Sequence, residues 1–165
     1  MALRNIREIG DRVLEKTCRP VAEVTPKIVD LVNDMVETMY EANGVGLAAP
    51  QVGILKRIVV IDVDPVEANP IIMINPEILE VSEETQTGDE GCLSVPGKAG
   101  QVTRPMKVKA RAQDINMETY EIEGEGLLAR AICHELDHLD GILYVTKVEG
   151  ELHGMEAPED VEIED

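Results

Sequence analysis

The sequence predicts one α+β domain with one amphipathic helix near the N-terminus. Antiparallel sheets are expected to pack around a central buried helix that carries the segment His-Glu-Leu-Asp-His. Three observations predict this class. Apolar residues recur at helical spacing over 28–39 and again over 127–140, and apolar and polar residues alternate over 107–123. The chain has 165 residues, enough for a single domain, which we place at 1–148.

The amphipathic helix is expected to begin at Pro26 and to end near Ala42. Thr25-Pro26 is typical of a helix N-cap followed by the first helical residue, and Asn43-Gly44 is typical of a helix end. The apolar residues between these signals fall on one face of a helix, so this face is expected to pack on the core. They are Ile28, Leu31, Val32, Met35, Val36 and Met39.

Strands and connections are expected between this helix and the second one. The β-branched run 57–63 predicts a strand, and 71–79 predicts another that breaks at Asn75-Pro76. The segment 98–105 is expected to be a polar connection. Alternation over 107–113 and 119–123 predicts a hairpin with one buried face. After the second helix, 142–148 predicts a closing strand.

Composition argues against several classes of partner. Thirty-three acidic residues against fifteen basic ones give a net charge of −18, and Trp and Phe are absent. This balance repels nucleic acid and anionic membranes, and it offers few aromatic platforms for bases. The N-terminus lacks the apolar core of a signal peptide, and the three cysteines have unrelated spacings. We therefore expect a cytoplasmic monomer that binds neither nucleic acid nor membrane.

The last seventeen residues, 149–165, differ from the rest of the chain. They contain eight acidic residues and no Lys or Arg. Such a composition cannot bury enough apolar surface to order a chain. We expect this segment to be a disordered acidic tail.

The segment 134–138 predicts a metal site. Two histidines four residues apart lie on one face of a helix, and Glu135 between them is near enough to reach a metal-bound water. The helix reads as mostly buried, so His134, Glu135 and His138 would be costly there without an ion. A metal site that performs chemistry needs three protein ligands and one open position. The chain must therefore supply a third ligand elsewhere.

Three candidates for this third ligand can be compared. A third histidine six residues after His138 would complete one protease pattern, but that position is Tyr144. Glu156 or Glu159 would fit another pattern by count, although both lie in the acidic tail, and a flexible tail is a poor ligand. Cys92 is the remaining candidate. A thiolate with two imidazoles suits Zn or Fe(II).

The segment 44–53 is small and apolar apart from one amide, Gln51. Glycines at 44 and 46 allow close approach of another backbone. A buried amide is costly unless it is hydrogen-bonded. The residues alone leave two possibilities for Gln51, a structural hydrogen bond or a role in an active site.

Three motifs together resemble those of the peptide deformylases. They are Gly-Val-Gly-Leu-Ala-Ala-Pro-Gln at 44–51, Glu-Gly-Cys-Leu-Ser at 90–94 and His-Glu-Leu-Asp-His at 134–138, in this order. The resemblance extends from the N-terminal arm to about Val148. It implies a metal-dependent hydrolase that removes the formyl group from the initiator N-formylmethionine of new polypeptides and releases formate. Its partners are then N-formylmethionyl peptides and nascent chains.

The resemblance also implies a role for particular residues. Cys92, His134 and His138 would hold one divalent metal, with a water in the fourth position. Glu135 would accept the proton of that water and pass it to the leaving amine. The amide of Gln51 and the backbone N–H of Leu93 would flank the formyl oxygen. The family points to Fe(II) as the native metal, although these donors also accept Zn, Ni or Co.

The family likeness extends to the substrate. The peptide would lie as an added strand beside Gly46 and Gly91. Its methionine side chain would enter an apolar pocket near Val45, Leu127, Ala131 and His134. The role of Arg130, which borders this face of the helix, stays open. Some deformylases continue into a basic C-terminal helix that docks on the ribosome, whereas this chain ends in acidic residues, so docking by that route is not expected.

Overall fold

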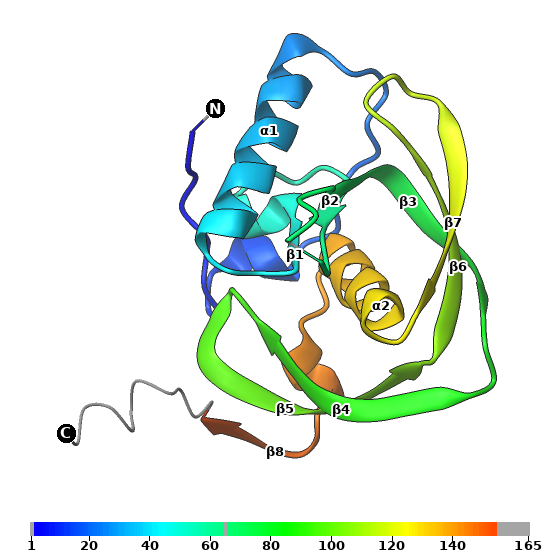
Figure 1. Cartoon of the computed structure of the whole chain (residues 1–165). Coiled ribbons are helices and arrows are strands. Elements are labelled where there is room, and N and C mark those ends of the chain that lie inside the picture. The colour runs from blue at the N-terminus through cyan, green and yellow to red at the C-terminus, as the bar shows by residue number, and fades with distance from the viewer. Residues whose placement is uncertain (1, 65, 155–165) are drawn as a thin grey trace.

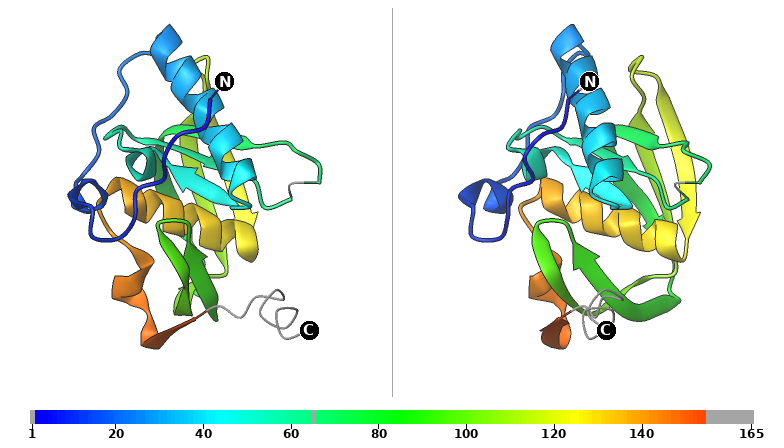
Figure 2. Two further views of the ribbon diagram at one scale, coloured as in Figure 1. Left: turned by 90° about the vertical axis from the view of Figure 1, so that its left-hand side faces the viewer. Right: turned by 60° about the vertical axis from the view of Figure 1, so that its left-hand side comes forward.

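The computed structural model describes residues 2–64 and 66–154. A five-stranded antiparallel sheet and a three-stranded antiparallel sheet lie on either side of helix α2 (Leu127–Leu139) (Figure 1). The larger sheet has the order β1 (Gly46–Ala48), β2 (Ile58–Ile61), β3 (Ile71–Val81), β6 (Lys107–Gln113) and β7 (Thr119–Glu125). The smaller sheet has the order β4 (Thr85–Cys92), β5 (Val95–Pro105) and β8 (Glu149–Gly154). In the side views of Figure 2, α2 crosses between the two sheets.

Helix α1 (Pro26–Glu41) forms as the sequence predicts. Thr25 caps it by accepting a hydrogen bond from the Ile28 N–H at 3.3 Å, and Pro26 is its first residue. Asn43, with φ of 59°, takes the left-handed conformation that ends the helix. The apolar face of α1 packs on β1 and β2 and forms a core cluster with them.

Helix α2 is buried on almost every side. It begins after Gly126, which has φ of 63°, and it is followed by Gly141, which has φ of 76°. A side chain at Gly141 would meet the backbone of Glu15 at 2.6 Å, so glycine permits both the turn and the close approach. Small and branched residues of α2 share a core cluster with β2, β3, β6 and β7. The helix therefore holds its polar residues inside the protein.

Three expectations about strands were wrong. Segment 98–105 belongs to β5 and is not a connection. It looks polar because Gln101 and Thr103 face solvent, whereas Val102 and Arg104, which alternate with them, are buried. Strand β3 continues through Asn75-Pro76, with a register shift against β6 there. The closing segment contains a 3-10 helix at Tyr144–Lys147 in place of a strand.

The expected disorder of 149–165 was also wrong for its first six residues. Glu149–Gly154 form β8, which pairs with β5 through Lys98 with Gly154 and Gln101 with Glu149. Backbone hydrogen bonds to β5 order this polar strand, although none of its side chains is buried. The composition of the segment gives no indication of such bonds. The absence of a side chain at Gly100 leaves room for Val148 and Leu152. The folded domain therefore extends past 148 to at least 154, and 155–165 lie outside the described residues.

Because β8 is part of the fold, we expect two truncated proteins to differ in thermal stability. Ending the chain after Val148 removes β8, and we expect a loss of about 2 kcal/mol from backbone hydrogen bonds and apolar contact. That loss lowers the midpoint of thermal unfolding by roughly 4–8 °C. Ending the chain after Gly154 is expected to leave the midpoint unchanged. Equal midpoints for the two truncated proteins, measured by circular dichroism, would show that β8 adds no stability.

Candidate active site

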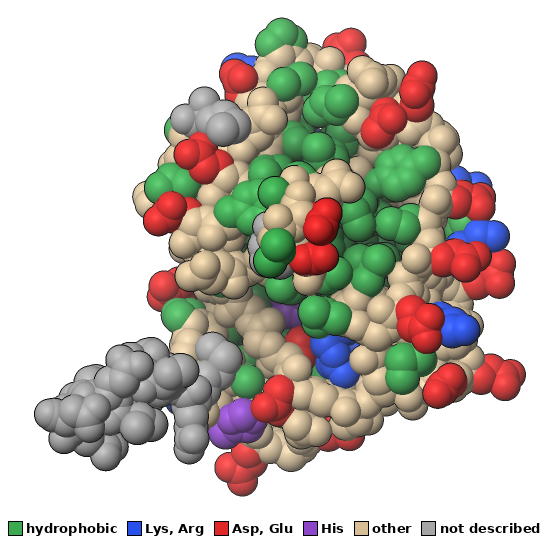
Figure 3. Space-filling model, in the orientation of Figure 1, with side chains coloured by type: hydrophobic (Ala, Val, Ile, Leu, Met, Phe, Trp, Pro, Cys, Tyr) green, Lys and Arg blue, Asp and Glu red, His purple; other side chains and the backbone are tan. Residues whose placement is uncertain are grey.

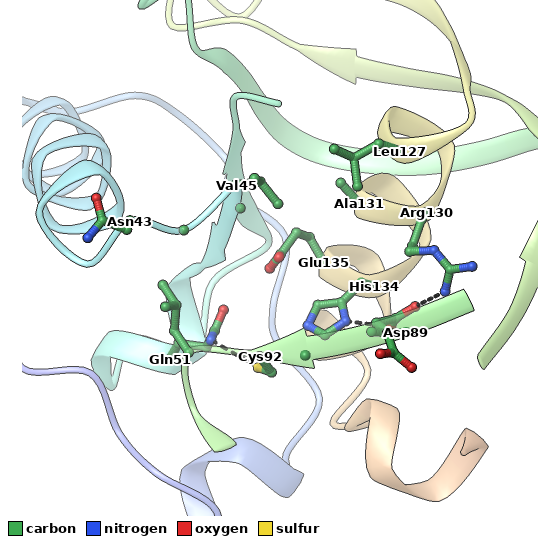
Figure 4. Close-up of a pocket in the computed structure, with 15 residues that line it drawn as sticks. Asn43, Val45, Gln51, Asp89, Cys92, Leu127, Arg130, Ala131, His134 and Glu135 are labelled. Atoms are coloured by element: carbon green, nitrogen blue, oxygen red, sulfur yellow. Dashed lines mark hydrogen bonds and ion pairs between the residues drawn. The ribbon is translucent and has the colours of Figure 1, made fainter. Parts of the chain in front are cut away.

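A cavity opens between the two sheets, beside α2. Its walls are the segment before β1, the end of β4 and one face of α2 (Figure 4). In the space-filling view, the hollow lies below an apolar area of this face, and histidine and acidic side chains are visible inside it (Figure 3). All but one of the site residues expected from the sequence line this cavity: Val45, Gly46, Gln51, Gly91, Cys92, Leu93, Leu127, Ala131, His134 and Glu135. The exception, His138, is fully buried behind Cys92.

Cys92, His134 and His138 converge at the bottom of the cavity. One donor atom from each lies within 4.8 Å of the other two, and the Cys92 Sγ is 3.3 Å from the His138 Nε2. The thiol comes from the end of β4, and both imidazoles come from α2. The structure therefore brings together residues that are more than forty positions apart, and the donor set is that of a zinc or iron site.

The surroundings of these donors fit a cation. The His134 Nδ1–H donates to the Glu90 Oε2 at 2.6 Å, which leaves the Nε2 lone pair free for an ion. Burial lowers the pKa of His138 to about 3, so its ring is neutral, as a metal-binding imidazole must be. Its Nδ1 has no hydrogen-bond partner among residues 2–64 and 66–154. Burial opposes the charge of His134, but hydrogen bonds with Cys92 and Glu90 outweigh it and raise its pKa well above the usual value, so an ion that binds at the Nε2 has to displace a proton there.

Glu90 contacts the donor cluster, and sequence reasoning did not single it out. Both of its oxygens accept hydrogen bonds from Arg104, at 3.1 and 2.6 Å, in addition to the bond from His134. Burial would raise the pKa of Glu90, but the bonds from His134 and Arg104 outweigh it and lower the pKa to about 2. Glu90 is therefore an anion that orients a donor imidazole. Its position two residues before Cys92, on the same side of a strand, was an available signal.

Glu135 lies in the wall of the cavity, next to Gly46. It is 5% exposed, and its Oε1 has no hydrogen-bond partner within the part of the chain that the structure describes. Burial raises the pKa of Glu135 to about 7. A Cβ at Gly46 would lie 2.5 Å from the Glu135 Oε2, so only glycine leaves room for this carboxylate. The carboxylate is thus available to a group inside the cavity.

Gln51 makes a structural hydrogen bond, the first of the two possibilities that the sequence left open. Its Oε1 accepts a hydrogen bond from the Ala48 N–H at 2.9 Å, which fixes the orientation of the amide. Its Nε2 donates to the Ser94 Oγ at 3.0 Å and lies 3.5 Å from the Cys92 Sγ. A structural bond therefore holds the amide nitrogen toward the donor cluster. Ser94, fully buried, is a second residue that sequence reasoning did not single out.

The outer part of the cavity is apolar and has two exposed strand edges. Val45 and Leu127 are 38% and 52% exposed, and Ala131 lies deeper (Figure 4). Strand β1 is an edge of the larger sheet and β4 is an edge of the smaller one. Gly46 and Gly91 belong to these edges, so their backbone groups are available to an extended peptide.

A sequence profile described as polypeptide deformylase matches residues 3–152. The chain belongs to the polypeptide deformylase family. A peptide deformylase from Agathobacter rectalis is 75% identical over 153 residues, which cover 93% of this chain and 94% of that protein. Another, from Lachnoclostridium phytofermentans, is 66% identical with 93% of each chain covered. The match therefore includes most of β8, in agreement with a domain that continues past 148.

Solved structures of the family have the same fold. The crystal structure of peptide deformylase from Thermotoga maritima matches with a TM-score of 0.86 at 42% identity, covering 90% of this chain and 99% of that one. A peptide deformylase from Synechococcus elongatus in complex with actinonin matches with a TM-score of 0.85 at 40% identity, covering 90% and 80%. The α+β class expected from the sequence is thus confirmed.

This membership establishes the reaction. The chain is a hydrolase that removes the N-formyl group from newly made polypeptides, and the family is metal-dependent. Within the described residues, neither helix has the length and apolar character needed to cross a membrane.

Proposed function

We propose that this chain performs deformylation at a metal centre held by Cys92, His134 and His138. The convergence of these three donor atoms within 4.8 Å, beside an anionic Glu90 that orients one of them, supports the proposal. Three protein ligands leave a position for water and substrate, as catalytic metal sites require. A bound divalent ion supplies Lewis-acid polarisation of the formyl group and lowers the pKa of water toward about 7.

Glu135 is the residue that moves the proton. It accepts a proton from the attacking water as the water oxygen bonds to the formyl carbon. It then delivers this proton to the amine nitrogen as the carbon–nitrogen bond breaks, which releases formate and a free N-terminus. The placement of Glu135 in the cavity wall, with an Oε1 that no described residue hydrogen-bonds, supports this role.

Gln51 and Leu93 stabilise the charge that develops on the formyl oxygen. The amide nitrogen of Gln51 donates one N–H to the Ser94 Oγ and the other to the Cys92 Sγ at 3.5 Å, and we propose that this second N–H turns to the formyl oxygen. The backbone N–H of Leu93, directly after Cys92, is the second donor. Each such donor is typically worth about 3 kcal/mol in the transition state.

The substrate is held by its backbone and its first side chain. An extended peptide pairs with the edges at Gly46 and Gly91, because both edges lack a strand partner on the cavity side within residues 2–64 and 66–154. The methionine side chain enters the apolar part of the cavity formed by Val45, Leu127 and Ala131. A thioether suits such a pocket because it is flexible and polarisable.

Fe(II) is the metal we propose for the native enzyme. The donors accept Zn, Ni or Co as well, and Zn binds such sites more tightly than Fe(II). We also propose that the enzyme is a cytoplasmic monomer that acts on formylated nascent chains without binding nucleic acid itself. The net charge of −18 supports the last point.

Formate release from formyl-Met-Ala tests the proposed reaction. Protein purified without oxygen, with its metal content measured, is expected to release formate and leave Met-Ala intact. A chelator should stop the reaction, and added Fe(II) should restore it. Release of free alanine would indicate a peptidase and would contradict the proposal.

Gly46→Ala tests the placement of Glu135. The new Cβ would lie 2.5 Å from the Glu135 Oε2 and would displace the carboxylate, and we expect about 100-fold lower kcat/KM with unchanged metal content. Gly44→Ala is the matched comparison, because its Cβ would meet only the end of the Leu93 side chain, at 2.6 Å. A change in the Leu93 rotamer relieves that contact, so we expect kcat/KM to fall by about 10-fold or less. Equal losses for the two variants would argue against displacement of Glu135.

A further inference from the structure

Arg130 is a buried charged residue that the proposed mechanism does not use. It lies on α2, one turn before His134, and is 8% exposed. Its Nη1 donates to the Glu90 Oε1 at 2.8 Å, while the His134 Nδ1 donates to the Glu90 Oε2 at 2.6 Å. Two side chains of one helix, four residues apart, thus hold the two oxygens of a single carboxylate on β4.

Arg130 also reaches the next strand of the smaller sheet. The same Nη1 donates to the backbone oxygen of Val102 on β5 at 3.0 Å. A Cβ at Gly88 would lie 3.5 Å from the Arg130 Nη2, so the guanidinium lies close against β4 where no side chain intervenes. One guanidinium therefore connects α2 with both β4 and β5.

This connection joins the two halves of the donor cluster. Cys92 follows Glu90 by two residues on β4, and His134 and His138 follow Arg130 on α2. Any sliding of α2 along β4 would separate the sulfur from the imidazoles. We propose that Arg130 is a positioning residue, which holds β4 and β5 against α2 through Glu90 and Val102 and so keeps Cys92 in register with the two histidines. The inference rests on the proposed metal centre.

Burial favours this role over simple packing. Arg130 and Glu90 are both nearly excluded from solvent, and taking a charged pair out of water costs about as much as the pair returns. Arg104 already forms two hydrogen bonds to Glu90, so neutralising its charge does not need Arg130. Arg104 also connects β5 with α2 through Asp137 at 2.9 Å, on the C-terminal side of His134, whereas Arg130 adds a contact with the smaller sheet one turn before His134.

Release of a bound metal measures this positioning directly. The holoenzyme loaded with Co(II) is mixed with a chromophoric chelator, and the rate of Co(II) release is followed, together with kcat and KM on formyl-Met-Ala. For Arg130→Met we expect about 10-fold faster Co(II) release and a similar fall in kcat. The loss of a residue that hydrogen-bonds to a metal ligand typically lowers metal affinity or activity by about 10–100-fold. KM should stay within about twofold of the wild type. Arg130→Lys, which keeps the charge and a donor, should recover most of both losses.

A double variant tests whether Arg130 acts through Glu90. In the Glu90→Gln background, where the anion is absent, Arg130→Met should change the release rate by less than twofold. If Arg130→Met does not fold, Arg130→Gln, which keeps a donor without the charge, replaces it in the same comparisons. Additive effects of the two substitutions would overturn the inference.

Two outcomes separate this inference from the proposed function. If Arg130→Met raises KM and leaves Co(II) release unchanged, Arg130 contacts substrate and its positioning role is wrong, while the metal centre stands. If the wild-type protein holds no metal, or Cys92→Ser holds Co(II) as tightly as the wild type, the proposed centre itself is wrong.

Discussion

Replacing Glu135 by alanine is expected to slow deformylation by a factor of about 10²–10⁴ while the protein keeps its metal. The carboxylate is the only proton carrier in the proposed mechanism, and a positioned general base typically contributes about 10²–10⁴-fold to the rate. Glu135 is not one of the three converging donors, so its removal leaves them in place. We therefore expect kcat on formyl-Met-Ala to fall by a factor in that range.

Formate release and metal analysis on the same preparation check this prediction. Glu123→Ala, at an exposed position on β7, is the matched control and should behave like the wild type. Near-normal turnover by Glu135→Ala would remove Glu135 as the proton carrier. Loss of metal together with activity would instead show that Glu135 supports the metal.

Replacing Cys92 by serine is expected to have the second large effect, on metal affinity. A neutral hydroxyl is a much weaker ligand than a thiolate, and Cys92 is the only donor of the cluster that comes from the smaller sheet. We expect at least about 100-fold weaker binding of Fe(II) or Zn. This loss of affinity exceeds the usual effect of replacing a residue that only hydrogen-bonds to a metal ligand.

Competition with a chromophoric chelator measures this affinity. Cys18→Ser is the control, because Cys18 lies outside the donor cluster and burial raises the pKa of its thiol to about 11. This control should bind metal like the wild type. Unchanged affinity in Cys92→Ser would mean that the third ligand lies elsewhere in the chain.

The helices and the hairpin could be predicted because their signals are local. Thr25-Pro26 and Asn43-Gly44 mark the ends of α1, and strict alternation marks β6 and β7. Strands β5 and β8 could not be predicted, because they form only by pairing with strands that are distant in the sequence. Polar residues such as Gln101 are compatible with an exposed strand that pairs with β4. The sequence around them does not indicate that β4 is the partner.

The three candidate metal donors could be predicted from the sequence, but the residues that hydrogen-bond behind them could not. His134 and His138 follow from helical spacing, and Cys92 was the remaining thiol of suitable setting. Glu90 acts through hydrogen bonds to Arg104 and Arg130, which lie 14 and 40 positions away. No periodicity links such residues, so the network behind the donors required the three-dimensional structure.

Titration of the metal-free enzyme with Co(II) tests the central claim most directly. Thiolate-to-cobalt charge-transfer absorption reports binding at Cys92, and formate release from formyl-Met-Ala reports the reaction. If deformylation occurs at a centre of Cys92, His134 and His138, both signals should rise together and level off at one Co(II) per chain. Formate release without added metal, or a saturated activity with no thiolate absorption, would contradict the proposed centre.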